Sequence, residues 1–272
     1  MTTTRVISEE DIVPHRAAGD RLAGGVLKNQ EWVSPTLNTT ADGALYLSIN
    51  DLIAWDKGLR ARAILAPASW KTVNDPVTLT SGNRYPYGFG WFIDTVAGKL
   101  RISHGGAWQG FKSAISRYIG EDLTVIVLAN SEAANPTTIA DGIAGAYLPT
   151  LMPRLLTPIA DDHPEVRARL DSLVRQAREG RLSPTDFAYL GAAFFPGAPR
   201  VFQGRLRDFG VVEHVSLVEH KRLGDDHMYT YELSKASAAL VVTMGIEPDN
   251  RISAFSVARK VPPLRGAPAS PK

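Results

Sequence analysis

The sequence predicts an α+β protein, in which an antiparallel sheet with flanking helices is followed by a small α+β C-terminal domain. Three observations support this fold class. Aromatic and β-branched segments separated by turn residues occupy residues 87–130. A segment with a helical pattern follows at 136–147, after Asn135 as cap and Pro136 in its first turn. A proline-rich stretch at 148–164 then precedes a second group of helices and strands.

The N-terminal region is predicted to be loop-rich and to lead into two helices. Residues 1–38 carry scattered apolar positions among prolines and glycines, which fits neither a helix nor a strand. Ser48 is a suitable helix cap, and the apolar residues after it recur at helical spacing to about Arg62. A second short helix is expected over 64–71, opened by Pro67.

The next region is predicted to form an antiparallel meander. The expected strands cover residues 87–93, 100–104, 111–119 and 123–130. The last of them is apolar along most of its length, which is typical of a central strand covered on both faces. The helix at 136–147 is expected to lie on one face of this sheet.

The C-terminal half is predicted to be a separate module. Residues 165–178 place apolar side chains on one stripe and end at Gly180, which indicates an amphipathic helix. Another helix is expected from Ser183-Pro184 to Phe194. Strands are expected at 201–209, 211–223, 228–234, 239–246 and 252–257. The predicted division is a first domain at 1–150, a linker at 151–163, a C-terminal domain at 164–261 and a disordered tail at 262–272.

Composition excludes several classes of function. The 272 residues include 30 basic and 28 acidic side chains for a net charge of +2, so no nucleic-acid partner is indicated. The chain has no cysteine, which excludes disulfides and thiol catalysis. No transmembrane segment or signal peptide is predicted, and the localisation stays open. The loop-like start of the sequence is typical of an internal fragment.

The stretch with the clearest chemical character is 102–111, which reads I-S-H-G-G-A-W-Q-G-F. Glycines at a strand edge allow a substrate or another backbone to approach closely. His104 beside them has a side chain that exchanges protons near neutral pH. The stretch can therefore bind a developing oxyanion through its N–H groups. The alternative is that the glycines form a turn or a β-bulge.

Three segments in a fixed order resemble the second half of a serine β-lactamase-related hydrolase. They are 45–55 (L-Y-L-S-I-N-D-L-I-A-W), 87–91 (Y-G-F-G-W), and 104–111 (H-G-G-A-W-Q-G-F) with 125–130 behind it. This family contains β-lactamases, penicillin-binding proteins and related esterases. The resemblance covers about residues 1–147 and implies an incomplete β-lactamase-like lobe.

The resemblance also implies roles for individual residues. In that family the third active-site motif is K-T-G or H-x-G on a strand that lines the cleft. His104 takes the lysine position, with Gly105 and Gly106 after it, and Ala107 would supply one N–H of the oxyanion hole. The implied catalytic candidates are His104, Gly106 and Ala107. The implied substrate-binding candidates are Gly105, Trp108 and Tyr87.

The family's other two motifs are absent from the chain. The nucleophile normally lies in S-x-x-K, but no serine stands three residues before any lysine here. The family's second motif is Y-x-N or S-x-N on a neighbouring loop; Ser48-Ile49-Asn50 spells S-x-N but is better interpreted as a helix cap. The sequence therefore predicts a hydrolase fragment that is inactive alone, with a peptide or small-molecule acyl substrate. The missing N-terminal half is a candidate partner, and no cofactor is implied. The alternative is a non-catalytic binding protein that keeps the cleft and the C-terminal module.

Two further sets of residues have competing interpretations. His214, His220 and His227 form a candidate metal cluster or lie on a solvated strand face. Trp91, Trp108, Tyr85 and Tyr87 line a substrate cleft or belong to the core.

Overall fold

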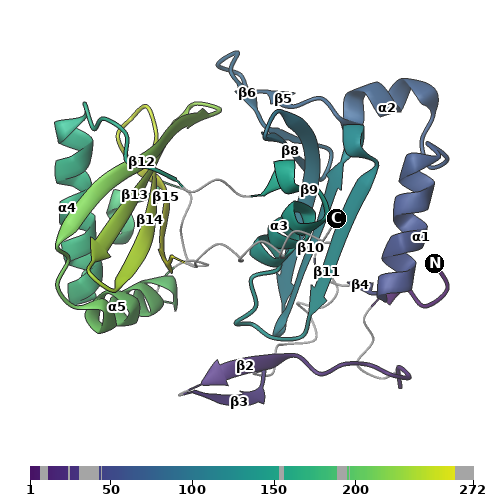
Figure 1. Ribbon diagram of the computed structural model, residues 1–272, viewed down its shortest axis with the longest axis horizontal. Helices are drawn as coiled ribbons and strands as arrows, with labels where there is room; N and C mark the ends of the chain where they lie inside the picture. Colours follow the sequence, from purple (N-terminus) through teal and green to yellow (C-terminus); the bar gives the residue numbers. More distant parts are fainter. Residues whose placement is uncertain are drawn as a thin grey trace, which may run out of the picture. The chain divides into compact units, whose positions relative to one another are not determined.

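The computed structural model describes residues 1–6, 12–23, 25–30, 43, 45–152, 156–188, 195 and 197–260. The chain divides into two compact units, drawn in Figure 1. The first contains residues up to Val77 and from Pro86 to Pro153, and the second contains Thr78–Tyr85 and the chain from Arg154 to Pro263. The sequence-based division placed 78–85 in the first domain, whereas this hairpin belongs to the second unit.

The first unit is built around a five-stranded antiparallel sheet in the order β11-β10-β9-β8-β7. The strands are β7 (Tyr87–Gly88), β8 (Trp91–Val96), β9 (Lys99–Trp108), β10 (Phe111–Tyr118) and β11 (Leu123–Ala129). Short turns join β8 to β9 and β9 to β10, and in each the second turn residue is a glycine with positive φ, Gly98 or Gly110. A short 3₁₀ turn, Ile119–Glu121, precedes β11.

Helices cover both faces of this sheet (Figure 1). Helix α3 (Pro136–Tyr147) packs Ala140 and Ala144 against Ala114, Tyr118 and Val125. Helix α1 (Ile49–Arg60) is joined to the opposite face, where Asp56 accepts hydrogen bonds from Arg117 and Thr124. Helix α2 (Pro67–Val73) follows α1, and Trp70 is its buried residue. The predicted helices before and after the sheet are confirmed, and Ser48 caps α1 in a full capping box with Asp51.

Short strands precede the sheet. β1 (Arg5–Val6) pairs with β4 (Leu45–Tyr46), and β2 (Asp20–Ala23) pairs with β3 (Val26–Asn29). The 3₁₀ turn Pro149–Leu151 follows α3 and places Leu151 in the core.

The second unit is a four-stranded antiparallel sheet in the order β12-β13-β14-β15, with two helices. Its elements are α4 (Pro164–Glu179), the 3₁₀ turn Pro184–Asp186, α5 (Gly197–Phe209), β12 (His214–Leu223), β13 (Asp226–Lys235), β14 (Ala238–Ile246) and β15 (Ile252–Arg259). The core lies between helices and sheet and includes Leu170, Leu206, Tyr231 and Val242. The hairpin of β5 (Val77–Thr78) and β6 (Arg84–Tyr85) reaches this unit, where Ser81 and Asn83 bond to Asp225.

Several sequence-based expectations are corrected. The predicted strand at 201–209 is helix α5, because Phe202, Leu206 and Phe209 are buried at helical spacing. The expected helix from residue 183 begins only as a 3₁₀ turn, and Phe187 instead bridges to Ile252; residues 189–194 lie outside the described residues. The predicted strand at 87–93 is split by a turn at Phe89-Gly90. Among the strands that the structure describes, β11 lies at the edge of the sheet rather than in its centre.

The region predicted to be a linker has ordered contacts with the second unit. The Ile159 N–H donates to the Leu217 carbonyl, and the Tyr231 hydroxyl donates to Asp161. The tail at 262–272 lies outside the described residues. None of the helices that the structure describes has the length and apolar character needed to cross a membrane.

Candidate functional site

The candidate site is the part of β9 that extends past its neighbour β8. β9 pairs with β8 up to the pair Phe92–Ser103, and pairs with β10 along its whole length to the pair Trp108–Phe111. The run of glycines is therefore regular strand, and the turn lies at Gln109-Gly110. This excludes the interpretation of Gly105-Gly106 as a turn or bulge.

The register determines which backbone groups of β9 are available. In an antiparallel ladder, alternate residues direct their N–H and C=O groups to opposite sides. Because the two-residue turn makes Trp108–Phe111 a hydrogen-bonded pair, Gly106 and His104 also face β10. Gly105 and Ala107 consequently face away from β10, beyond the end of β8. Among the residues that the structure describes, none pairs with this edge, and residues 104–107 are exposed.

His104 is held at the end of β8 by two aromatic residues. The Tyr87 hydroxyl lies 3.0 Å from His104 Nε2, within hydrogen-bond distance. The Phe92 ring stacks on the imidazole, with ring centroids 5.9 Å apart and an interplanar angle of 25°. Tyr87 and Phe92 contact each other edge to face at 4.8 Å. The imidazole is therefore oriented while it stays exposed beside the free strand edge.

A side chain at either glycine of this edge would crowd Ser113 on β10. A Cβ at Gly106 would lie 2.7 Å from the hydroxyl oxygen of Ser113, its partner on β10. A Cβ at Gly105 would lie 3.2 Å from the Ser113 carbonyl oxygen. Ser113 and Phe92 were not identified from the sequence, because their place beside the motif follows from strand register alone.

Only one of the four aromatic residues considered for a substrate cleft lies beside His104. Tyr87 belongs to the site, whereas Trp108 packs against Gly43, where a Cβ would lie 3.3 Å from the indole Cγ. Trp91 pairs with Gly88 in the β7–β8 turn. Tyr85 lies in the second unit and contacts the Gly224 turn.

The three histidines considered as a candidate metal cluster do not come together in the structure. His220 and His227 meet, with Nε2 and Nδ1 3.2 Å apart, but His214 lies opposite Ser234 at the other end of β12. His163 contacts the His220 ring instead. Within the described part of the chain, no group of three or more His, Asp or Glu is arranged to hold a metal ion.

Part of the chain is similar in sequence to penicillin-binding proteins and D-aminopeptidases. No family model matches the chain. Over 92 residues, 34% of this chain and 20% of the relative, it is 36% identical to penicillin-binding protein 4* of Bacillus subtilis (strain 168). Over 134 residues, 48% of this chain and 26% of the relative, it is 29% identical to the D-aminopeptidase of Gluconobacter oxydans (strain 621H). The chain thus matches about a fifth to a quarter of the length of these curated relatives.

Among solved structures, the octameric penicillin-binding protein homologue from Pyrococcus abyssi matches with a TM-score of 0.47 and 15% identity, over 94% of this chain and 56% of that one. The sequence relatives extend over part of the chain only. The homologues of this chain are penicillin-binding proteins and D-aminopeptidases, which belong to the serine β-lactamase-related hydrolase family.

Proposed function

We propose that this chain supplies the substrate-binding edge of a serine hydrolase that cleaves an acyl compound, and that it is inactive alone because it lacks the nucleophile. The carrying observation is that Gly105 and Ala107 direct unpaired backbone groups outward beside the oriented His104. A rigid strand edge with free N–H groups suits acyl transfer, because the donors are fixed before charge develops.

In this proposal the substrate lies along β9 as an additional strand. Its backbone pairs with Gly105 and Ala107, and the Ala107 N–H donates to the carbonyl oxygen as that oxygen becomes negative. A donor of this kind contributes about 3 kcal/mol of transition-state stabilisation. His104 orients the substrate or transfers a proton at its ring nitrogen, and Tyr87 fixes the imidazole orientation.

The nucleophile is assigned to a segment outside this sequence, because no lysine of the chain has a serine three positions before it. The geometry of β11 supports a missing segment. By the same alternation, Thr124, Ile126 and Leu128 face away from β10. This outward edge is closed at one end by Arg60, which donates to the Asp122 carbonyl, and at the other by the Asp20 N–H, which donates to the Asn130 carbonyl. Between these ends, no strand pairs with β11 in the described residues.

Apolar surface flanks the same edge. Ile139, Ile143 and Tyr147 recur every four residues along α3 and are 42%, 46% and 71% exposed. A groove of about 440 Å³ lies beside β11; its lining combines apolar residues such as Ile53, Ile126 and Tyr147 with charged ones such as Asp56, Lys57 and Arg60. An unpaired apolar edge strand beside an exposed apolar helix stripe favours one further strand and helix packing here.

The relatives favour a peptide as substrate. Two of them are D-aminopeptidase and penicillin-binding protein by name, and an open strand edge binds a peptide backbone without regard to side chains. We therefore propose that a peptide amide is the natural acyl donor, and that β-lactams and esters are the alternatives to be compared in the same assay.

The test compares the chain alone with a longer product that includes any in-frame coding sequence upstream. Both are assayed with D-alanine p-nitroanilide, nitrocefin and a p-nitrophenyl ester. The chain alone is expected to match the uncatalysed rate. A longer product containing S-x-x-K and Y-x-N is expected to turn over at least one substrate and to lose that activity in a His104→Ala variant. Turnover by the chain alone that is lost in His104→Ala would contradict the proposal.

The second candidate function is binding without catalysis. The absence of S-x-x-K favours it, since the substrate edge remains without an attacking group. If the upstream sequence encodes neither motif, the chain is expected to bind a D-alanine-containing peptide without cleaving it. A His104→Ala or Tyr87→Phe change should then weaken this binding.

A further inference from the structure

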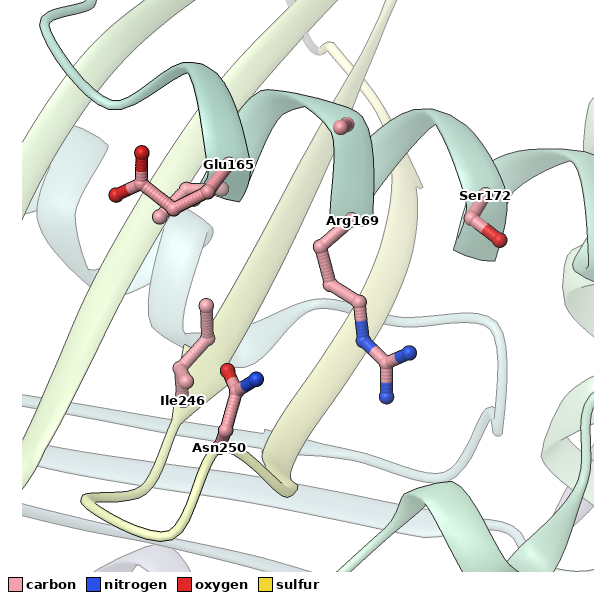
Figure 2. Close-up of a pocket in the computed structure, with 7 residues that line it drawn as sticks. Glu165, Arg169, Ser172, Ile246 and Asn250 are labelled. Carbon is pink, nitrogen blue, oxygen red and sulfur yellow. The ribbon is translucent and has the colours of Figure 1, made fainter.

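A pocket in the second unit lies between α4 and the turn that joins β14 to β15. Its volume is about 300 Å³, which accommodates a molecule the size of a modified amino acid. Val166 and Ile246 contribute apolar surface, whereas Arg169 and Asn250 contribute polar groups. Figure 2 shows the Arg169 guanidinium extending from the helix into the space beside Asn250.

The Arg169 guanidinium is incompletely satisfied. Its Nε is buried and has no hydrogen-bond partner among the described residues. Asp186 Oδ1 lies 3.7 Å from Nη2, an ion-pair distance that is too long for a hydrogen bond. Nε is inaccessible, but the Arg169 side chain as a whole is 31% exposed, so a ligand in the pocket meets the terminal nitrogens of the guanidinium.

The other polar residues that line the pocket, Glu165 and Ser172, are directed elsewhere. The Glu165 carboxylate points away from Arg169 in Figure 2, and its side chain is 72% exposed. The Ser172 hydroxyl accepts a hydrogen bond from Gln176. In Figure 2 the Asn250 amide lies between Ile246 and the Arg169 guanidinium, so the two polar side chains border the same space beside Ile246.

We propose that this pocket binds the carboxylate of a small organic acid of the N-acylated amino acid type. The planar guanidinium donates two parallel hydrogen bonds to a carboxylate, and the Asn250 amide adds a third donor. The apolar substituent of the ligand contacts Ile246 and Val166. A phosphate dianion is disfavoured more than a carboxylate, because Arg169 carries one positive charge, Asp186 lies 3.7 Å from its Nη2 and offsets part of that charge, and a dianion adds twice the negative charge.

The test titrates N-acetyl-L-valine into the ¹⁵N-labelled chain, with N-acetyl-L-valinamide as the uncharged control. Chemical-shift changes are expected at residues 165–172 and 246–250, and the amide should bind at least about ten-fold more weakly than the acid. Inorganic phosphate is titrated in parallel. Equal binding of acid and amide, equal or tighter binding of phosphate, or no saturation below about 10 mM acid would overturn the proposal.

Matched variants of α4 separate the pocket from general charge. Arg169→Met should weaken binding of the acid at least about ten-fold, whereas Arg175→Met, an exposed arginine on the same helix, should leave it unchanged. Arg169→Lys keeps the charge but loses the planar fork, and an intermediate loss is expected. If Arg169→Met does not fold, Arg169→Lys and Asn250→Ala carry the test. Unchanged affinity in either of these two would overturn the proposal.

Discussion

The Tyr87 hydroxyl lies 3.0 Å from Nε2 of His104, so a residue of the outermost strand β7 is bonded to the strand two places further in. This contact occurs where β8 stops pairing with β9. The contact holds the exposed His104 imidazole in one orientation at the start of the free edge of β9. Without such a partner, an exposed side chain on a strand end would rotate. The contact is the basis of the first prediction.

Tyr87→Phe removes the hydroxyl and keeps the ring contact with Phe92. The free energy of unfolding is expected to fall by about 1 kcal/mol or less, because the lost hydrogen bond is exposed. The His104 ring should sample more than one orientation and change its tautomer ratio, measured by ¹⁵N chemical shifts of the imidazole. Tyr147→Phe is the control. Tyr147 is 71% exposed, and removal of its hydroxyl should leave the His104 shifts unchanged.

Gly110→Ala is expected to be far more destabilising than Gly98→Ala. Both glycines occupy the second position of a two-residue turn with positive φ, +80° and +77°. A Cβ at Gly110 would lie 2.7 Å from the Asp20 backbone nitrogen, whereas a Cβ at Gly98 meets nothing within 4 Å. We expect a cost of about 1 kcal/mol at Gly98 and about 3 kcal/mol at Gly110. Urea unfolding followed by tryptophan fluorescence measures both, and equal costs would contradict the close approach.

The predictability of the fold differed between the two halves of the chain for a physical reason. Helix α1 was predictable because Ser48 and Asp51 carry a local capping signal. Helix α5 was not, because Val201, Phe202 and Leu206 also suit a strand, and the choice depends on packing against α4 and β15. Pro199, which lies in the first turn of α5, is the one local signal in this segment that favours a helix start.

The candidate site was predictable in part. The residue types at 104–107 indicated a strand with a glycine-lined edge, and the segment is extended in the structure, whereas its role in binding an oxyanion stays a prediction. The number of residues by which β9 exceeds β8 was not predictable, because it depends on the Phe89-Gly90 turn that shortens β8. The role of β11 as an edge was also hidden, because helices on both faces give it the apolar composition of a central strand.

Asp56→Asn is expected to destabilise the first unit strongly. Asp56 accepts from Arg60 Nε at 2.6 Å, Arg117 Nε at 2.8 Å and the Thr124 hydroxyl at 3.0 Å. Because Asp56 and Arg117 are both buried, loss of the carboxylate charge leaves the guanidinium uncompensated, and the cost is about 3 kcal/mol. Asp171→Asn, which removes an exposed partner of Arg167, is the control and should cost less than about 0.5 kcal/mol.

The ionisation of Asp56 should also make the free energy of unfolding depend on pH. Burial opposes ionisation of Asp56, but hydrogen bonds from Arg60, Arg117 and Thr124 outweigh it and hold its pKa below the usual value. A lowered pKa in the folded state stabilises the fold above the unfolded-state pKa of about 4, and this contribution is lost as the pH falls through the folded-state value. The stability difference between the native chain and Asp56→Asn should therefore shrink below about pH 4. A difference that grows as the solution is acidified would contradict this assignment.

Ile143→Lys distinguishes a surface that faces solvent from one that a further segment covers. Ile143 is 46% exposed in the middle of the α3 stripe, so in this chain the lysine should change the free energy of unfolding by less than about 0.5 kcal/mol. Sedimentation velocity should show less self-association, because a charge interrupts the apolar stripe. In a longer product that includes the missing strand and helix, the same change should cost about 2 kcal/mol, since the side chain would then be buried.

Ile119→Lys, at an exposed isoleucine outside the stripe, should be neutral in both products. If Ile143→Lys is equally neutral in the longer product, the α3 stripe is not where the missing segment packs.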